Sequence, residues 1–344
     1  MTASDLLPLL ARLADGATLS EAECAEIVGQ MMDGRVTQGQ MGAFLMALRA
    51  RGETVDELTG AVRALRQRVA AVEAPEGAID TCGTGGDGQH TLNISTAAAF
   101  VAAGAGAIVA KHGNRAQSSK SGSADVLEAL GVRLDLTPAA IARSIREIGL
   151  GFMFAPAHHG ALKAVGPVRR ELGFRTLFNL TGPLANPAHC KRQLLGVFSL
   201  RWVEPLARTL KALGTEKAWV VHGAGNLDEI STTGPSEVAV LEQGRIGHFT
   251  ITPSAFGFAP ATINDLRGGD AGHNARALRA LLDGEKGPYR DIVLLNAAAA
   301  LVVAGRAGDL GQGVTDATAA LDSGKAKNKL DQLIALSRAL GGQP

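Results

Sequence analysis

The chain has 344 residues, of which 46% are apolar and 19% charged, and its 34 basic side chains nearly balance 33 acidic ones, for a net charge of +1. Disordered chains combine low hydrophobicity with high net charge, and nonspecific nucleic-acid binders usually carry a large basic excess. We therefore expect a soluble globular protein with no nucleic-acid partner. Two counts are unusual: 43 glycines, about 12% against a background of roughly 7%, and only ten Phe, two Trp and one Tyr.

The cysteines and the length of the longest apolar stretch indicate the cellular compartment of the protein. Cys24, Cys82 and Cys190 are odd in number, far apart and without a Cys-x-x-Cys pair, so we expect reduced, buried thiols. The first residues carry no basic segment ahead of an apolar stretch, so no signal peptide is predicted. The longest apolar run, Ala97 to Ala110, is shorter than the ~20 residues of a membrane helix. These features predict a cytoplasmic protein with no membrane partner.

The first 72 residues are predicted to be helical. Ser20-x-x-Glu23 and Thr54-x-x-Glu57 have the form of capping boxes, which satisfy the free amides at a helix start. Apolar residues then recur at the 3 or 4 spacing of a buried helix face: Met41, Phe44, Leu45 and Leu48. The segment Val72 to Gly77 interrupts this pattern with Pro75 and is predicted to be a linker.

From Ala78 onward the pattern is that of an α/β domain. Short β-prone runs at Ala107 to Ala110, Trp219 to Val221 and Val238 to Leu241 are each expected to be followed by glycine and then a helix. Such alternation indicates a mainly parallel sheet that binds ligands at the carboxyl ends of its strands. Thr137-Pro138 is predicted to start a further helix, with Thr as cap and Pro in the first turn.

The densest cluster of functional residue types begins with the glycine-rich run from Asp80 to Gly88. Four glycines in six positions allow positive φ angles and bring backbone amides against an anion. Asn93 to Thr96 then leads into an apolar helix that should start near Ser95, so its free amides should face the same place. We interpret this as a phosphate site. Gly83, Gly85 and Gly88 also match the dinucleotide pattern G-x-G-x-x-G, but the next strand ends in Lys111 instead of an acidic residue; a simple tight turn is the other alternative.

Two further clusters follow predicted strands. Lys111 to Ser119, continued by Lys120 to Ser123, gathers cations, an amide and hydroxyls that suit an anionic ligand, against the alternative of a solvated surface. Asp228 and Glu229 are adjacent carboxylates in a glycine-rich loop, a pairing suited to magnesium together with phosphate oxygens and water. An Asp-Glu pair in isolation is more often a surface turn.

A fourth cluster is basic and runs from Pro167 to Thr176, after His158 and His159. One arginine could bind a carboxylate through two hydrogen bonds. A helix with arginines on its solvated face explains the same residues equally well.

Several long motifs in this order resemble the anthranilate phosphoribosyltransferase family over about residues 20 to 333. The matching motifs are Gly83–Asp87, Asn93–Thr96, Lys111–Ala116, Ser121–Gly131, Phe178–Leu184, Leu227–Pro235, Leu266–Asp270 and Leu294–Ala298. The resemblance implies a small N-terminal helical domain and a larger α/β domain with a mainly parallel central sheet, of the nucleoside phosphorylase and phosphoribosyltransferase type. It places the helical domain at 1–72, completed by about 168–190, and the α/β domain at 73–167 and 191–344.

The resemblance also implies substrates, metal and site residues. The expected reaction, a step of tryptophan biosynthesis, transfers the phosphoribosyl group of 5-phosphoribosyl 1-pyrophosphate (PRPP) to the amine of anthranilate, with Mg²⁺, two per monomer, in a homodimer formed through the helical domain. The expected PRPP contacts are Gly83, Gly86, Asp87, Thr91, Asn93, Ile94, Ser95, Thr96, Lys111, His112, Gly113, Asn114, Arg115, Ala116, Gln117, Ser118, Ser119 and Ser123. The expected anthranilate contacts are Gly83, Asn114 and Arg169, and the expected metal ligands are Ser95, Asp228 and Glu229.

An arylamine already carries its lone pair at neutral pH, so no general base is expected; electrostatic help is assigned to Asp228, Glu229 and Lys111. The chain departs from the family pattern at Gly160 and Thr181, near the expected anthranilate tunnel. A pyrimidine nucleoside phosphorylase and a nucleic-acid-binding relative of the same fold are the alternatives. Pyrimidine nucleoside phosphorylases are longer and lack the motif found here at Lys111–Arg115. A nucleic-acid-binding relative would have lost the Asp228-Glu229 pair and gained basic surface, whereas this chain keeps the pair and has a net charge of +1.

Overall fold

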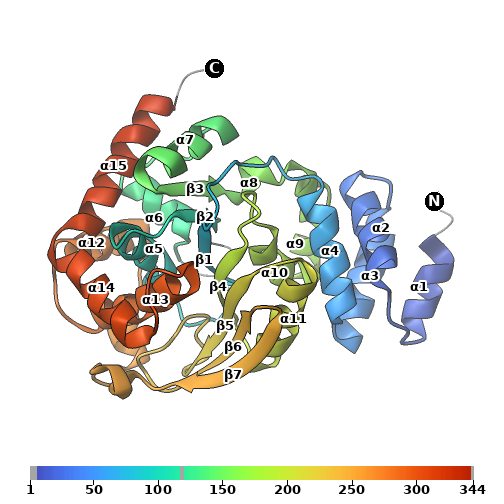
Figure 1. Ribbon diagram of the computed structural model, residues 1–344. Helices are drawn as coiled ribbons and strands as arrows, with labels where there is room; N and C mark the ends of the chain where they lie inside the picture. Colours follow the sequence, from blue (N-terminus) through green and yellow to red (C-terminus); the bar gives the residue numbers. More distant parts are fainter. Residues whose placement is uncertain (1–5, 117–119, 342–344) are drawn as a thin grey trace.

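The computed structural model describes residues 6–116 and 120–341 (Figure 1). Four helices form one end of the molecule, at the right of Figure 1: α1 (Leu6–Ala14), α2 (Glu21–Met32), α3 (Gln38–Arg51) and α4 (Val55–Arg66). Both predicted capping boxes are confirmed, because Ser20 and Thr54 each accept a hydrogen bond from the third helical amide. A third box at Thr37 and Gln40 starts α3 and was not predicted.

One seven-stranded sheet organises the rest of the chain, in the order β3-β2-β1-β4-β5-β6-β7. The strands are β1 (Ile79–Gly83), β2 (Val109–Gly113), β3 (Leu150–Phe154), β4 (Arg192–Gly196), β5 (Lys217–Gly223), β6 (Ser236–Glu242) and β7 (Arg245–Ile251). The first five are parallel, and β6 and β7 are antiparallel additions. The predicted mainly parallel sheet beside a small helical domain is therefore confirmed.

Helices pack on both faces of this sheet, and others pack on those helices or beside α1 to α4. The helices after β1 are α5 (Ile94–Gly104), α6 (Ser123–Ala129), α7 (Pro138–Ile148), α8 (Ala155–His158), α9 (Gly166–Leu172), α10 (Leu177–Thr181), α11 (Val203–Ala212), α12 (Ala271–Leu282), α13 (Pro288–Ala304), α14 (Leu310–Asp322) and α15 (Lys325–Leu340). Helix α7 begins with the predicted Thr137 cap and Pro138. None of the helices in the described ranges combines the length and apolar character that a membrane crossing requires.

The prediction that a helix follows each β-prone run is wrong for two of them. After β5 the chain returns as β6, and Val238 to Leu241 in β6 is followed by β7. Between β6 and β7 the reason is a two-residue hairpin turn: Gln243 and Gly244 both have positive φ angles, 50° and 71°, which match the twist of paired strands. The run at Ala107 also starts its strand late, because Gly106 and Ala107 close the turn after α5 and β2 extends to Gly113.

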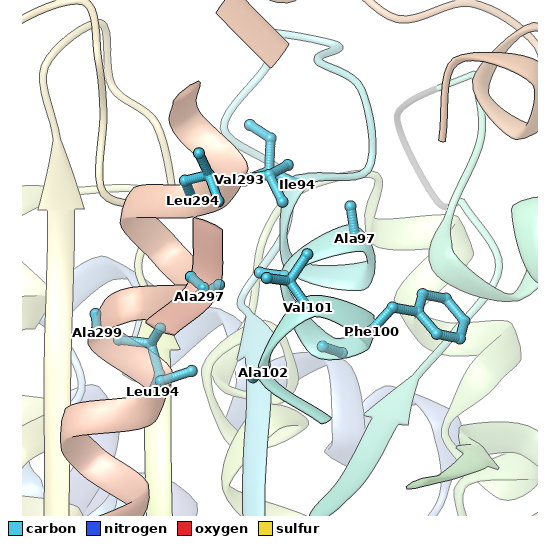
Figure 2. Packing of buried hydrophobic residues seen from close by; sticks show 14 of the residues in the cluster. Ile94, Ala97, Phe100, Val101, Ala102, Leu194, Val293, Leu294, Ala297 and Ala299 are labelled. Atoms are coloured by element: carbon cyan, nitrogen blue, oxygen red, sulfur yellow. The ribbon is translucent and has the colours of Figure 1, made fainter. Parts of the chain in front are cut away.

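Alternate residues of the central strands enter different hydrophobic cores. Leu194 of β4 and Val221 of β5 face the core that contains α5 and α13, whereas Leu195 and Val220 face the core shared with α1 to α4. Figure 2 shows the first core, with Ile94 and Val101 of α5 beside α13. Helix α5 is therefore packed on all sides, and its amino end is fixed at the carboxyl edge of the sheet.

Candidate active site

The order in which strands are added to the sheet reverses between β1 and β4. From β1 the chain builds β2 and β3 on one side, then returns to place β4 on the other side of β1. Ligands of open α/β sheets bind at such a switch point, outside the carboxyl ends of the strands. The loops after β1, β2, β4 and β5 all start at this edge, and they contain three of the four predicted clusters.

Glycines at two strand ends allow Asp228 to approach the sheet. A Cβ on Gly83, the last residue of β1, would lie 2.9 Å from Asp228 Cγ and nearer still to its Oδ2. A Cβ on Gly196, the last residue of β4, would overlap the Asp228 carbonyl, with its Cα only 3.2 Å away. The loop after β5 thus passes directly over the ends of β1 and β4, and any larger side chain at either glycine would displace it.

The Asp228 and Glu229 carboxylates bind backbone amides of the predicted phosphate site. Gly85 N donates to Asp228 Oδ2 at 2.6 Å, and Ser95 N, in the first turn of α5, donates to Glu229 Oε1 at 3.0 Å. Both carboxylates are half-buried, and desolvation is the main cause that raises each pKa above its ordinary value. The nearby Asp87 raises the pKa of Asp228 further, and Asp228 does the same to Glu229. Both side chains therefore face the predicted phosphate site.

This donor set fits magnesium bound together with a phosphate ligand. Two half-buried carboxylates with a neighbouring acid are a concentration of negative charge that a divalent cation would relieve, and Mg²⁺ takes one or two carboxylates plus phosphate oxygens and water. Within residues 6–116 and 120–341, no three His, Cys, Asp or Glu side chains are close enough to hold a metal by themselves.

Lys111 extends the site below the start of α5. Its side chain is buried, and Nζ donates to the Thr81 carbonyl and to Ser95 Oγ at 3.3 Å. The predicted metal ligand Ser95 thus lies between Lys111 and Glu229. Of the other residues in the α5 run, Ile94 and Thr96 are buried, and Asn93 precedes the helix.

The described residues after β2 contact the start of α6. Ser123 Oγ, at the start of α6, donates to the Asn114 carbonyl at 3.3 Å, and a Cβ on Gly113 would overlap Ser123. Arg115 pairs with Asp125 and Glu128 at 2.9 and 2.8 Å, and Ala116 N also donates to Asp125. Arg115 is therefore held by two carboxylates here. The predicted PRPP contacts Gln117, Ser118 and Ser119 lie outside the described residues.

His112 belongs to a group of buried histidines behind this turn. Its ring lies 5.1 Å from that of His159, and its backbone amide donates to Asp80 Oδ1 at 3.0 Å. Burial lowers the pKa of His112 well below the ordinary value and that of His159 to about 4. The neighbouring His158, whose Nδ1 contacts the Ala70 carbonyl, lowers both further.

The other predicted PRPP contacts in and after the glycine-rich loop are Gly86, Asp87 and Thr91. Gly86 has a φ of 74°, Asp87 Oδ1 accepts from Gln89 N at 3.0 Å, and Thr91 forms an isolated bridge with Arg267. The positive φ angles of Gly85, Gly86 and Gly88 confirm that this run needs glycine.

Arg169 lies on α9 with its guanidinium 5.5 Å from the Phe178 ring centroid. Burial lowers the pKa of its guanidinium, and no carboxylate among the described residues pairs with it. A half-buried cation without an anion suits a carboxylate ligand. No hydrogen bond or ion pair in the described part of the chain joins it to Gly83 or Asn114.

The two departures from the family pattern differ in packing. Gly160, in a short 3-10 helix (Gly160–Ala164), has open space where a Cβ would be. Thr181 ends α10 fully buried, and its hydroxyl has no hydrogen-bond partner in the described ranges.

Asn296 and Asn274 were not predicted as site residues, and Arg175 was predicted only as part of the fourth cluster. Arg175 donates to the Gly86 carbonyl at 2.7 Å and stacks on Phe198 at 4.3 Å, so it holds the glycine loop. Asn296 bonds both the N–H and the carbonyl of Ile230, at 2.9 and 2.8 Å, which fixes the chain next to Glu229. Asn274 contacts Asn93 from α12. Asn296 lies in a motif that carried the resemblance, so the motif was the available signal; Arg175 and Asn274 contact partners far away in sequence.

Comparison with family models gives two consecutive matches. Residues 7–69 match the glycosyl transferase family helical bundle domain, and residues 75–327 match the glycosyl transferase family a/b domain. Among curated proteins, the chain is 58% identical over 336 residues to the anthranilate phosphoribosyltransferase of Azorhizobium caulinodans, and 56% identical over 337 residues to that of Xanthobacter autotrophicus. Each alignment covers 98% of both chains.

Solved structures agree. The anthranilate phosphoribosyltransferase of Thermus thermophilus is 41% identical with a TM-score of 0.91, over 98% of this chain and 100% of that one. The Saccharomyces cerevisiae enzyme in complex with PRPP and Mg is 27% identical with a TM-score of 0.89, over 98% and 99% of the two chains. The same yeast enzyme in complex with 4-fluoroanthranilate has a TM-score of 0.88 at 25% identity, with the same coverage.

Proposed function

The chain belongs to the anthranilate phosphoribosyltransferases of the glycosyl transferase family, and we propose that it performs the transfer at the site formed by the Gly83–Gly88 loop, the start of α5 and the Asp228–Glu229 pair. Its reaction joins the amine of anthranilate to the phosphoribosyl group of PRPP and releases pyrophosphate, a step of tryptophan biosynthesis. The observation that carries the site is that Asp228 accepts from an amide of the glycine loop, Gly85 N, and Glu229 from an amide of the α5 start, Ser95 N. Amides of the loop and the helix start would then bind phosphate oxygens.

The chemistry asks for positioning and charge stabilisation. The anthranilate nitrogen attacks the anomeric carbon, the bond to pyrophosphate breaks with its electron pair on the leaving oxygen, and the nitrogen then loses a proton. Magnesium, when bound, neutralises charge on the departing pyrophosphate. Asp228, Glu229 and Ser95 would hold the metal, and Lys111, beside Ser95, would add positive charge. Arg169 would bind the anthranilate carboxylate, and Gly83 and Asn114 would also contact anthranilate. These roles rest on the resemblance and on the lack of a carboxylate partner for Arg169 in the described part of the chain.

We further propose two magnesium ions per monomer. Asp228 bonds the glycine loop while Glu229 bonds the start of α5, so the two carboxylates face different donor groups. Each carboxylate could therefore bind a separate magnesium ion next to the same pyrophosphate. Calorimetric titration with Mg²⁺ in the presence of PRPP should give a stoichiometry of two; a value of one would contradict this count.

The domain division and the assembly are proposals as well. We assign residues 1–72 with about 168–190 to the helical domain, because Val168, Leu177 and Leu184 share a core with α2 to α4. A homodimer through this domain is supported by Leu7 and Met46, which stay 59% and 51% exposed. Sedimentation of Met46→Glu should show monomers where the unaltered chain shows dimers. We place the protein in the cytoplasm, since its three cysteines are unpaired and its family is biosynthetic.

A direct assay tests the proposed function. The purified chain with PRPP, Mg²⁺ and anthranilate should consume anthranilate, followed as loss of its fluorescence, and release one pyrophosphate per anthranilate. Omission of PRPP is the control. A stable fluorescence signal from folded protein would contradict the assignment.

A further inference from the structure

Three segments that are far apart in sequence meet at Asn93. The stretch before Asn93 pairs with the segment that leads into α12: Leu92 N donates to the Leu266 carbonyl at 2.9 Å, and Gly268 N donates to the His90 carbonyl at 2.8 Å. A Cβ on Gly268 would lie 2.6 Å from the Thr91 carbonyl, so this approach requires glycine. From α13, the only tyrosine of the chain, Tyr289, donates its hydroxyl to the Asn93 carbonyl at 3.2 Å.

The side chain of Asn93 is bound by Asn274, which is only 2% exposed. Gly269 N donates to Asn274 Oδ1 at 2.8 Å, and Asn274 Nδ2 donates to Asn93 Oδ1, also at 2.8 Å. Asn93 Nδ2 in turn donates toward the Ser121 carbonyl at 3.5 Å. Three hydrogen bonds thus run in series from a backbone N–H to a backbone carbonyl.

The two ends of this series decide which way each amide faces. A backbone N–H can only donate and a carbonyl can only accept, so Asn274 must turn its oxygen to Gly269 and Asn93 must turn its oxygen to Asn274. The N–H₂ group of Asn93 is thereby directed to the Ser121 carbonyl, two residues from Ser123, which the family resemblance places among the PRPP contacts. Phosphate oxygens only accept hydrogen bonds, so this is the orientation that an anionic donor substrate requires.

A second observation supports a role outside local helix stability. Asn93 occupies the position just before α5, where asparagine usually accepts hydrogen bonds from the first-turn amides. Here its side chain makes no such bond, because its oxygen is used by Asn274. The first-turn amides of α5 therefore stay available to acidic groups, as the Ser95 N bond to Glu229 shows.

We propose that Asn274 is a positioning residue for the donor substrate, which fixes the carboxamide of Asn93 with its N–H₂ group toward the bound PRPP. This inference rests on the proposed function and extends it to a residue that does not touch substrate. Asn274 acts through Asn93, so the two residues behave as one unit toward PRPP.

Substitution of Asn274 by aspartate tests the orientation. A carboxylate still accepts from Gly269 N but cannot donate to Asn93, so Asn93 turns over and presents its oxygen to the phosphate. We expect the KM for PRPP to rise at least about tenfold, with kcat and the KM for anthranilate changed less than threefold. Asn264→Asp is the matched control: it adds the same charge at an exposed position ten residues earlier and should change no constant more than twofold.

Two further comparisons separate positioning from a structural role. Asn274→Ala removes more contacts and should lower the melting temperature more than Asn274→Asp, yet raise the KM for PRPP less, because Asn93 is then free to adopt either orientation. In an Asn93→Ala background, Asn274→Asp should add less than twofold to that KM. The proposal would be overturned if the two substitutions raised the KM for PRPP independently, so that their effects multiply in the double variant. It would also be overturned if the less stable of the two Asn274 variants had the higher KM for PRPP. If Asn274→Asp does not fold, the same cycle with Asn274→Ala decides.

A ligand-free readout keeps this test apart from the assignment of activity. Amide hydrogen exchange of residues 91–97 in the unliganded chain should be faster in Asn274→Asp than in Asn264→Asp. Equal exchange would overturn the proposal even if turnover is normal. Absence of turnover in both the unaltered chain and Asn264→Asp would contradict the proposed function instead.

Discussion

Substitution of Gly83 by alanine should disable the site while the sheet stays folded. The φ angle of Gly83 is outside the positive region, so alanine fits the backbone, but its Cβ would lie 2.9 Å from Asp228 Cγ and still closer to Oδ2. Ordinary contact begins at about 3.4 Å, so the carboxylate must move by roughly 1 Å. A displacement of that size in a catalytic group can cost about 100-fold in rate, about 2.7 kcal/mol. The stability cost of such overpacking is about 1–3 kcal/mol.

The assay is anthranilate consumption by Gly83→Ala at several magnesium concentrations. We expect kcat to fall about 100-fold and the magnesium concentration for half-maximal rate to rise, because the displaced group is the proposed metal ligand. Gly247→Ala on β7 is the matched control: a Cβ there meets nothing within 4 Å, so activity should be unchanged. Full activity of Gly83→Ala, with unchanged magnesium dependence, would refute the placement of Asp228 against Gly83.

Three other predictions concern the acceptor side, acid stability and the helical domain. Arg169→Ala should lower kcat/KM for anthranilate by at least about 30-fold (about 2 kcal/mol), whereas exposed Arg170→Ala should not; equal effects would exclude a specific carboxylate contact. His159 has a pKa lowered to about 4 by burial and by His158, so the unfolded chain binds its proton first as pH falls. Above pH 6.5 the ring is neutral in both states, and between pH 6.5 and about 4 its protonation in the unfolded chain lowers the free energy of unfolding by about 1.4 kcal/mol per pH unit. In His159→Gln, urea unfolding measured at several pH values should show a smaller fall of that free energy over the same range. Glu57, fully buried, accepts from Leu19 N and pairs with Arg51; Glu57→Ala should cost about 3–5 kcal/mol, and urea unfolding showing under 1 kcal/mol would contradict this.

Local sequence was sufficient where neighbours in the chain decide the structure. The capping boxes at Ser20 and Thr54 involve residues three apart, and both formed as predicted. The element after β6 was mispredicted because the apolar run of β6 does not distinguish a hairpin from a crossover to a helix. The deciding residues are the positive-φ pair Gln243 and Gly244.

The site was predictable in its parts and not in its connections. The acidic pair and the glycine loop could be recognised from composition and order, but their contact joins residues 143 positions apart. Asn274 reaches Asn93 across 181 positions, so no local pattern could reveal that it sets the orientation of a predicted ligand-binding side chain. Gly196 shows the same limit, because its need for glycine comes entirely from Asp228.

In the proposed reaction, Asp228 and Glu229 form the magnesium-dependent part of the phosphoribosyl transfer site. This role is tested most directly by the double substitution Asp228→Ala with Glu229→Gln, measured as anthranilate consumption across a magnesium titration, with circular dichroism to confirm folding. We predict a folded protein without magnesium-dependent turnover. Near-normal turnover with an unchanged magnesium response would contradict the claim.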